Sequence, residues 1–361
     1  MGFHLETFFV DVFAPQRGDV LTILYDLPHG EIKDTSAWQE RRGMAAEWHD
    51  RINSFAPSYG VRVNPIVVYQ ATGAHARDLP EFGHQEGKTV RVEAIAKEST
   101  IIISMPQFSA TAPLLVLTRK YEDLRVASMP LVSKAMEETG LSADYSKIAR
   151  VCAQLALLFD QSEGIEVNFS TGHRCYFDIS DHKPARQDNG RLYPGQKDFR
   201  LRNFPSGEVF VVPNEGLQSK TEGEIPVNAK GEMVILVVER NRIVGVRGDG
   251  PLATQERREF QEEYALSNIA EVAIGCNDKA VVTGNVLEDE KAGFHWAFGR
   301  SDFLGGTVSP KDFSTPEKVL HQDIVYAKGN PIVCERFNFI FPDGTRKTAI
   351  VDGKLMINDG V

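Results

Sequence analysis

The sequence predicts two domains: an N-terminal α/β domain on an open, Rossmann-like sheet, and an α+β C-terminal domain with mainly antiparallel strands. In the first part of the chain, continuous apolar runs alternate with helical stretches, as in α/β proteins. From about residue 165 the pattern changes to short strands of period two with turn residues between them. A chain of 361 residues is long enough for two separate cores, and we place the domains at 1–160 and 161–361.

The first domain contains one clear buried strand. Residues 20–25 (VLTILY) are a continuous apolar run after a Gly-Asp turn, which is typical of a parallel strand covered on both faces. A helix follows at 35–55, where large apolar residues recur near helical spacing. Neither a GxGxxG after the first strand nor a GxxxxGK[ST] occurs, so the sequence does not support a nucleotide site. Further strands are predicted at 61–69, 101–105 and 114–117, with a closing amphipathic helix at 150–159.

The second domain is predicted to be mostly antiparallel. Residues 165–169 and 175–179 alternate at period two around a Ser-Thr-Gly turn, which indicates a hairpin. A polar helix is expected at 257–266. The remaining strands are predicted at 208–213, 233–238, 243–246, 337–341, 348–351 and 355–357, the last three joined by Asp-Gly turns.

Charge and composition exclude several classes of partner. The net charge is −10, so no basic field attracts nucleic acid or an anionic membrane surface, and we expect neither partner. The N-terminus lacks the pattern of a signal peptide, and no run approaches the roughly 20 apolar residues of a spanning helix. The four cysteines are scattered without a CxxC pair, as in a reducing compartment. We therefore expect a cytoplasmic protein.

Metal-ligand residue types are concentrated in residues 286–326. Glu290, His295, His321 and Asp323 combine carboxylate oxygens with imidazole nitrogens, the donors that divalent metals use in proteins. His321 and Asp323 flank a single residue, so in a strand their side chains would point to the same face. Any one of these residues alone is more often a solvated acid or a structural histidine. The combination predicts a metal site.

Two upstream carboxylates have the form of ligands on strands. Glu208 follows a Pro-Ser-Gly turn at the start of an apolar strand, where an unpaired charge would be costly without a cation. Glu271 lies within an otherwise apolar run, so it is either at an exposed edge or paired with a positive group. With the previous four residues they make six candidate ligands, which exceed the three protein ligands of one tetrahedral catalytic zinc. Two metals sharing a bridging carboxylate fit this number.

Four ordered segments give the chain a family resemblance. They are NFPSGEVFVVP (203–213), NIAEVAIGCN (268–277), LEDEKAGFHWAFG (287–299) and HQDIVY (321–326). At these residues the chain resembles the aminopeptidase T/S-type metallopeptidases, thermophilic enzymes related to leucyl aminopeptidases. The resemblance implies a peptide or amide substrate, a homodimer whose packing encloses the site, and two divalent ions, zinc, cobalt or manganese. It implies metal ligands at Glu208, Glu271, His295, His321 and Asp323, with Glu290 at an acidic site position and Glu271 or Glu290 as general base.

One departure leaves alternatives open. Peptidases of this family have a tyrosine seven residues after the histidine at position 295, whereas this chain has Asp302 there. That tyrosine would assist the tetrahedral intermediate. The runner-up is a non-haem iron dioxygenase of the same fold that opens dihydroxypyridine rings with two histidines and one carboxylate. His321 and Asp323 match two of its ligands, but the third is a histidine near the position of Glu271. The other alternative is a metal-binding member that has lost catalysis.

Overall fold

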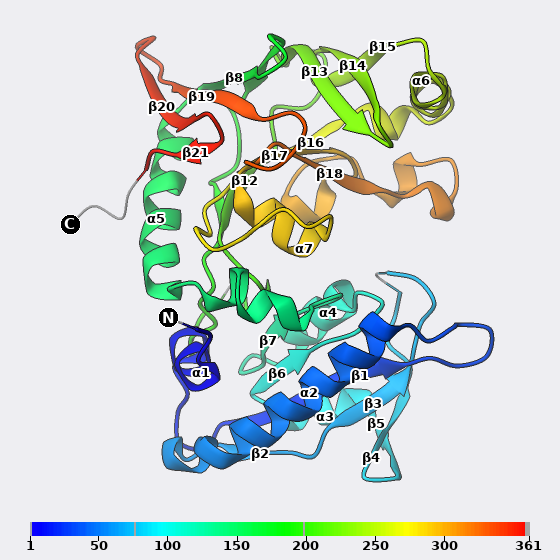
Figure 1. Ribbon diagram of the computed structural model, residues 1–361, viewed down its shortest axis with the longest axis vertical. Coiled ribbons are helices and arrows are strands. Elements are labelled where there is room, and N and C mark those ends of the chain that lie inside the picture. Colours follow the sequence, from blue (N-terminus) through cyan, green and yellow to red (C-terminus); the bar gives the residue numbers. More distant parts are fainter. Residues whose placement is uncertain (1, 76, 198, 358–361) are drawn as a thin grey trace. The chain divides into compact units, whose positions relative to one another are not determined.

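Two compact units make up the chain (Figure 1). The computed structural model describes residues 2–75, 77–197 and 199–357. The N-terminal unit is the chain up to Ala149 together with Asp188–Ser206 and Asp278–Ala280. The C-terminal unit is Arg150–Gln187, Gly207–Asn277 and the chain from Val281 onward. The prediction of one boundary after residue 160 did not anticipate the two later segments that belong to the N-terminal unit.

A mixed eight-stranded sheet forms the centre of the N-terminal unit, in the order β11-β7-β6-β1-β3-β4-β5, with β2 beside β1. The predicted buried strand is β1 (Val20–Leu27), which pairs in parallel with its neighbours on both sides. This confirms the α/β fold class. The other strands are β2 (Arg62–Val63), β3 (Val67–Gln70), β4 (Phe82–Gln85), β5 (Lys88–Arg91), β6 (Ile101–Ser104), β7 (Arg125–Ser128) and β11 (Leu201–Asn203).

Helices cover both faces of this sheet. The longest is α2 (Ser36–Phe55), which begins where the Thr35 side chain accepts a hydrogen bond from the backbone N–H of Trp38. It runs across the sheet in Figure 1. Residues of α3 and α4 share a buried core with Leu24 and Val126 on the strands. The helix bounds are α1 (Leu5–Phe13), α3 (Val92–Glu98) and α4 (Thr111–Lys120).

The strand predicted at 114–117 is wrong, because these residues belong to α4. Leu114 and Thr118 are buried while Val116 is 60% exposed, so burial follows helical spacing and not a strand. The missing parallel strand is β7, which begins with Arg125 and is buried along its whole length. Because β7 begins with a charged residue, the hydrophobic pattern of the sequence did not indicate a buried strand there.

Antiparallel sheets form the C-terminal unit, as predicted. The larger one has the order β15-β14-β13-β9-β8-β19-β20-β21, and the predicted hairpin is its β8–β9 pair. The smaller one has the order β10-β12-β16-β17-β18. The bounds are β8 (Gly164–Phe169), β9 (Arg174–Asp178), β10 (Arg186–Asp188), β12 (Glu208–Val211), β13 (Glu222–Ala229), β14 (Glu232–Glu239), β15 (Arg242–Arg247), β16 (Ile269–Gly275), β17 (Phe294–Gly299), β18 (His321–Val325), β19 (Cys334–Ile340), β20 (Arg346–Val351) and β21 (Lys354–Leu355).

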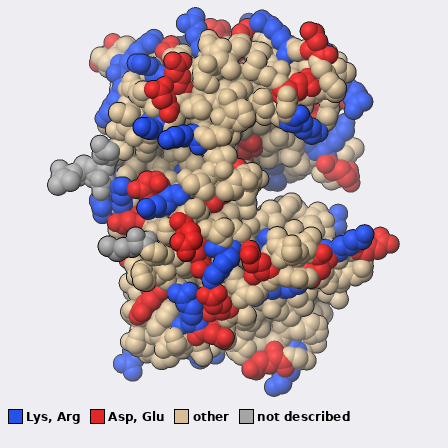
Figure 2. Space-filling view, in the orientation of Figure 1, with Lys and Arg blue, Asp and Glu red and all other residues tan. Residues whose placement is uncertain are grey.

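The helices with residues in this unit are α5 (Tyr145–Gln161), α6 (Pro251–Glu262) and α7 (Val286–Asp289). The helix predicted at 257–266 begins earlier, because Pro251 occupies its first turn, where a missing N–H costs nothing. Within the described ranges, no helix is long and apolar enough to cross a membrane. On the face shown in Figure 2, acidic and basic side chains are interspersed.

A buried ion pair ties the start of β7 to the rest of the N-terminal unit. Arg125 donates to the carboxylate of Asp19 at 2.7 Å and to the backbone oxygens of Phe13 and Leu192. Its side chain is only 3% exposed. Removing one partner of a buried pair leaves the other charge without compensation.

We expect Arg125→Met to lower the free energy of unfolding of this unit by about 3–5 kcal/mol. Urea titration followed by tryptophan fluorescence measures it, because Trp38 and Trp48 are buried in this unit. The control is Arg51→Met, which breaks an exposed pair with Glu47 on one helix and should cost about 0.5 kcal/mol or less. Similar losses in both variants would show that the buried pair of Arg125 and Asp19 contributes no more to stability than an exposed pair.

Candidate metal centre

The predicted ligands lie on one face of the five-stranded sheet. In this sheet the pairs β12–β16, β16–β17 and β17–β18 are antiparallel. Glu271 faces Ala297 across one pair of strands, and Ala297 faces Asp323 across the next. Alternate residues of a strand and directly opposed residues share a face. This face therefore carries Glu208, Glu271, His295, His321 and Asp323.

Small residues separate these ligands. Glu208 is opposite Gly275, His295 is opposite Ala273, and His321 is opposite Gly299. The other face of the same strands carries large buried side chains, among them Ile274 and Trp296. One face thus has room for ions among its carboxylates, while the other face anchors the strands in the core.

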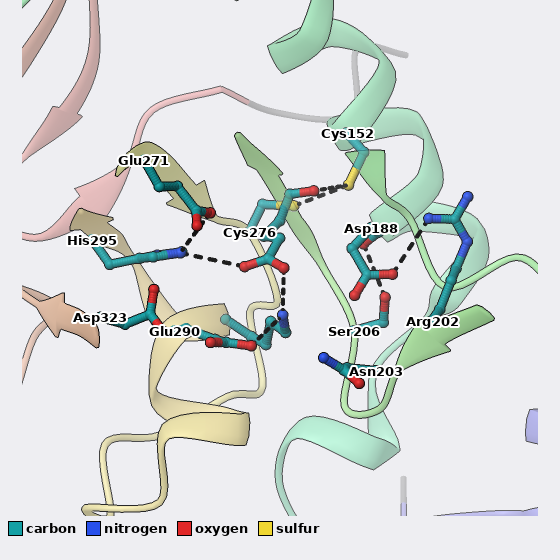
Figure 3. A network of polar contacts seen from close by, with 12 residues as sticks. Cys152, Asp188, Arg202, Asn203, Ser206, Glu271, Cys276, Glu290, His295 and Asp323 are labelled. Atoms are coloured by element: carbon teal, nitrogen blue, oxygen red, sulfur yellow. Dashed lines mark hydrogen bonds and ion pairs between the residues drawn. The ribbon is translucent and has the colours of Figure 1, made fainter. Parts of the chain in front are cut away.

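Three buried residues form what we call the inner cluster: Glu208, Glu271 and His295. The His295 Nε2 lies 3.4 Å from the Glu208 Oε2 and 3.8 Å from the Glu271 Oε1. Figure 3 shows the Glu271 and His295 side chains turned toward each other from neighbouring strands. One ligand atom from each residue lies within 4.8 Å of the others, which is close enough to surround a metal ion.

A second group, the outer cluster, consists of Glu271, His321 and Asp323. The His321 Nε2 lies 3.1 Å from the Glu271 Oε2 and 3.6 Å from the Asp323 Oδ1. Glu271 belongs to both clusters and presents a different oxygen to each histidine. A carboxylate in this position can bridge two ions.

Both histidines are oriented as metal ligands. The Nδ1 of His321 lies 2.7 Å from the backbone oxygen of Arg300, and the Nδ1 of His295 lies 3.3 Å from that of Gly293. A carbonyl oxygen only accepts hydrogen bonds, so each Nδ1 carries a hydrogen and each Nε2 faces the carboxylates. A backbone carbonyl commonly orients a metal-bound histidine in this way. The donor set therefore fits divalent metal.

Charges between these groups determine their protonation. Burial lowers the pKa of His295 and of His321, but the facing carboxylates outweigh burial and hold both pKa values well above the usual range. Burial raises the pKa of Glu208 and Glu271, but Lys291 and the histidines more than offset it, and both values lie below normal. Without metal, the site consists of carboxylates separated by imidazolium ions.

Glu290, the remaining predicted ligand, belongs to neither cluster. Its Oε1 lies 2.6 Å from the Nζ of Lys291, which also lies 2.6 Å from the Glu208 Oε1. Burial raises the pKa of Glu290 to about 8, with Lys291 opposing the rise and Glu208 and Asp323 adding to it. Glu290 is thus placed to carry a proton beside the clusters.

Sequence reasoning missed Lys291 as a site residue. Its side chain has no exposed surface, and it is the cation in direct contact with Glu208. The only signal was its position next to Glu290 within the LEDEKAGFH segment. Its role emerges only when the turn around Glu290 folds against β16.

Asp302, the residue in place of the family tyrosine, pairs with Arg300 at 2.6 Å. The backbone oxygen of Arg300 orients His321, and the neighbouring ring of Phe303 lies 5.1 Å from the His321 ring, edge to face. Asp302 therefore stabilises the loop behind a candidate ligand.

Comparisons with known proteins establish the fold and no family. No known family model matches the chain, and no curated protein matches its sequence. The solved structure of 2,5-dihydroxypyridine dioxygenase from Pseudomonas putida KT2440 is similar, with a TM-score of 0.63, 14% identity and coverage of 98% of this chain and 96% of that chain. Wild-type AmpT from Thermus thermophilus is similar with a TM-score of 0.54, 14% identity and coverage of 98% of each chain.

Both neighbours are enzymes, one a dioxygenase and the other an aminopeptidase. Identity this low shows a shared fold alone, so the predicted family resemblance is confirmed only for the fold. The same fold carries two different chemistries, so function has to be argued from the site. The metal-ligand roles of the six residues stay predictions.

Metal binding to the metal-free protein at pH 7 should release about two protons, because an ion at each Nε2 replaces the proton of an imidazolium. A raised histidine pKa also stabilises the metal-free fold below that pKa, and this stabilisation is lost as the pH rises through it. Zinc titration by calorimetry in buffers of different ionisation enthalpy counts the protons. His321→Gln should reduce the release by about one proton. A binding enthalpy independent of buffer would contradict this prediction.

Gly275 is the point where the Glu290 turn approaches β16. A Cβ there would lie 2.2 Å from the backbone oxygen of Glu290 and 2.4 Å from the carbonyl carbon of Lys291. We expect Gly275→Ala to cost about 1–3 kcal/mol of unfolding free energy and to weaken metal binding by displacing Lys291. Gly245→Ala is the matched control, because its nearest neighbour in the adjacent strand is 3.6 Å away. Equal behaviour of the two variants would show that the close approach is unimportant.

Proposed function

We propose that this protein is a metal-dependent hydrolase resembling an aminopeptidase, which removes N-terminal residues from peptides at a two-ion centre. The observation that carries the proposal is the pair of clusters that share Glu271, with an Nε2 of each histidine aimed at the carboxylates. Two neighbouring divalent ions lower the pKa of a shared water and polarise a substrate carbonyl.

Glu271 and Glu290 have different parts in this proposal. Glu271 presents one oxygen to each cluster, so it holds the two ion positions at a fixed separation. With one oxygen committed to each ion, it would be a weaker proton acceptor than a carboxylate that binds no metal. Glu290 lies outside both clusters, so its carboxyl group is not committed to metal, and burial raises its pKa to about 8, which makes it a stronger base once it has lost its own proton. The general base, open between these two residues from the sequence, is therefore assigned to Glu290.

The charge of the site changes when metal binds. In the metal-free site the carboxylates of Glu208, Glu271 and Asp323 are balanced by Lys291 and two imidazolium ions. With two divalent ions in place of the imidazolium protons, the oxygens of a peptide carbonyl are the substrate atoms that the site attracts. The peptide substrate and the homodimer remain part of the proposal.

A ring-cleaving iron dioxygenase is the second candidate, because the dioxygenase is the structural neighbour with the higher TM-score of the two described above. Such enzymes bind one iron through two histidines and a carboxylate, with open positions. Here each cluster contains one histidine and two carboxylates, and Glu271 lies between the histidines. The donor set therefore favours the hydrolase. A non-catalytic metal-binding protein is the third possibility.

Protein loaded with zinc, cobalt or manganese should hydrolyse amino-acid anilides or short peptides, with two ions per chain by elemental analysis. One bound iron with oxygen uptake on a dihydroxylated pyridine would support the dioxygenase instead. Bound metal with neither activity would support the non-catalytic protein.

Two substitutions separate the roles of the glutamates. Glu271→Ala should lose bound metal as well as activity, because it removes the shared ligand. Glu290→Gln should keep metal and lower kcat by about 10²–10⁴-fold, which is the typical contribution of a general base. Glu239→Ala, at an exposed strand end, is the control and should leave both unchanged. Metal loss of the same extent in Glu290→Gln would make Glu290 a ligand.

A further inference from the structure

We infer that the two ion positions are unequal and that Lys291 makes them so: the outer cluster is the tight position, and the inner cluster is the weak one. The inference rests on the proposed function in one respect, namely that both clusters bind divalent ions. It adds the order of filling and the residue that sets this order.

The two clusters are closely matched in donors, which makes them an internal comparison. Each consists of one histidine and two carboxylates, and Glu271 is common to both. In each, the histidine Nδ1 is held by a backbone oxygen and the Nε2 faces the carboxylates. The remaining carboxylate is Glu208 in the inner cluster and Asp323 in the outer cluster. Any inequality therefore comes from what surrounds these two residues.

Of Glu208 and Asp323, Lys291 pairs with Glu208. Its Nζ lies 2.6 Å from the Glu208 Oε1, so one oxygen of this carboxylate already has a cation. Glu208 can offer an incoming ion only its other oxygen, Oε2, while the fixed ammonium beyond it repels a dication. For Glu271 and Asp323, by contrast, the described part of the chain supplies no Lys or Arg nitrogen within 4 Å of the carboxylate.

The difference in burial between the two clusters also weakens metal binding at the inner cluster. Glu208, Glu271 and His295 are all buried, whereas the His321 and Asp323 side chains keep 16% and 17% of their exposure. An ion entering the inner cluster must give up more of its water, while an ion at the outer cluster can keep some. Since Lys291 has no exposed surface, it cannot contact substrate. It is a positioning residue, and its effect acts through Glu208.

At limiting metal the protein then holds one ion, at the outer cluster. The inner position fills only at higher metal, and the two-ion chemistry proposed above begins there. The number of bound ions therefore depends on the metal concentration. Lys291 causes this dependence, because its charge belongs to the protein and remains when metal binds.

Titration of metal-free full-length protein with Co²⁺, followed by calorimetry and visible absorption, tests this. Wild type should bind two ions in two steps whose dissociation constants differ at least about tenfold. Asp323→Asn should remove the tight step, and His295→Gln should remove the weak step. Lys291→Met should tighten the weak step at least about tenfold and leave the tight step within about threefold.

Two more variants keep the test decisive. Lys318→Met removes a partly exposed lysine that pairs with Glu263 outside the clusters, and it should change neither step. Lys291→Gln removes the same charge with a polar side chain, so it should tighten the weak step in the same way, and it serves if Lys291→Met does not fold. Two equal steps, loss of the tight step in His295→Gln, or an unchanged weak step in the folded Lys291 variants would overturn the inference alone. Absence of any Co²⁺ binding would overturn the proposed function as well.

Discussion

Repulsion among carboxylates on one side of a sheet is the constraint on which this site depends. Glu208, Glu271 and Asp323 present their oxygens within two clusters that share the middle residue. Carboxylates this close repel one another, and the buried pair Glu208 and Glu271 stays ionised only where cations lie nearby. Two imidazolium ions and Lys291 supply that charge in the metal-free protein. Metal ions can replace the two imidazolium protons, but the charge of Lys291 is part of the chain and remains.

The antiparallel sheet places these carboxylates and histidines side by side on neighbouring strands. Neighbouring strands place residues that are distant in sequence side by side, and alternation keeps their charged groups off the apolar face. His321 and Asp323 come from one strand, whereas Glu271 and His295 come from the two strands before it. An Ala or Gly lies opposite each of them on a neighbouring strand, so small residues separate the candidate ligands. Sites on strands hold their geometry more closely than sites on loops.

Local sequence predicted those parts of the site that depend on alternation alone. The spacing of His321 and Asp323 places both on one face of β18, and the structure has them there. The sequence also offered two environments for Glu271, an exposed edge or a positive partner, and the structure shows the second, with His321 at 3.1 Å. That choice depends on the register of β16 against β17, which local pattern does not determine.

Other parts depended on tertiary contacts and could not be predicted. Glu290 was grouped with the ligands because of its spacing from His295; it lies 2.6 Å from Lys291 and outside both clusters, and its ligand role stays a prediction. The chain gives no local sign that a lysine there is fully buried. In the N-terminal unit, Arg125 hid a buried strand for the same reason: its charge is cancelled by Asp19, which lies far away in sequence. Buried charge pairs are where hydrophobic patterns mislead.

Under the proposed function, the occupancy of the clusters would also decide which residue can accept a proton. With an ion at the outer cluster only, Glu271 uses its Oε2 and leaves Oε1, which faces His295, outside the ion's coordination. With both ions present, both oxygens of Glu271 are engaged, and Glu290 is the remaining buried acid beside the clusters. Under the proposed function, a one-ion and a two-ion form of the protein would thus use different general bases. The dioxygenase and the aminopeptidase share the fold of this chain, so the fold alone does not select between such forms.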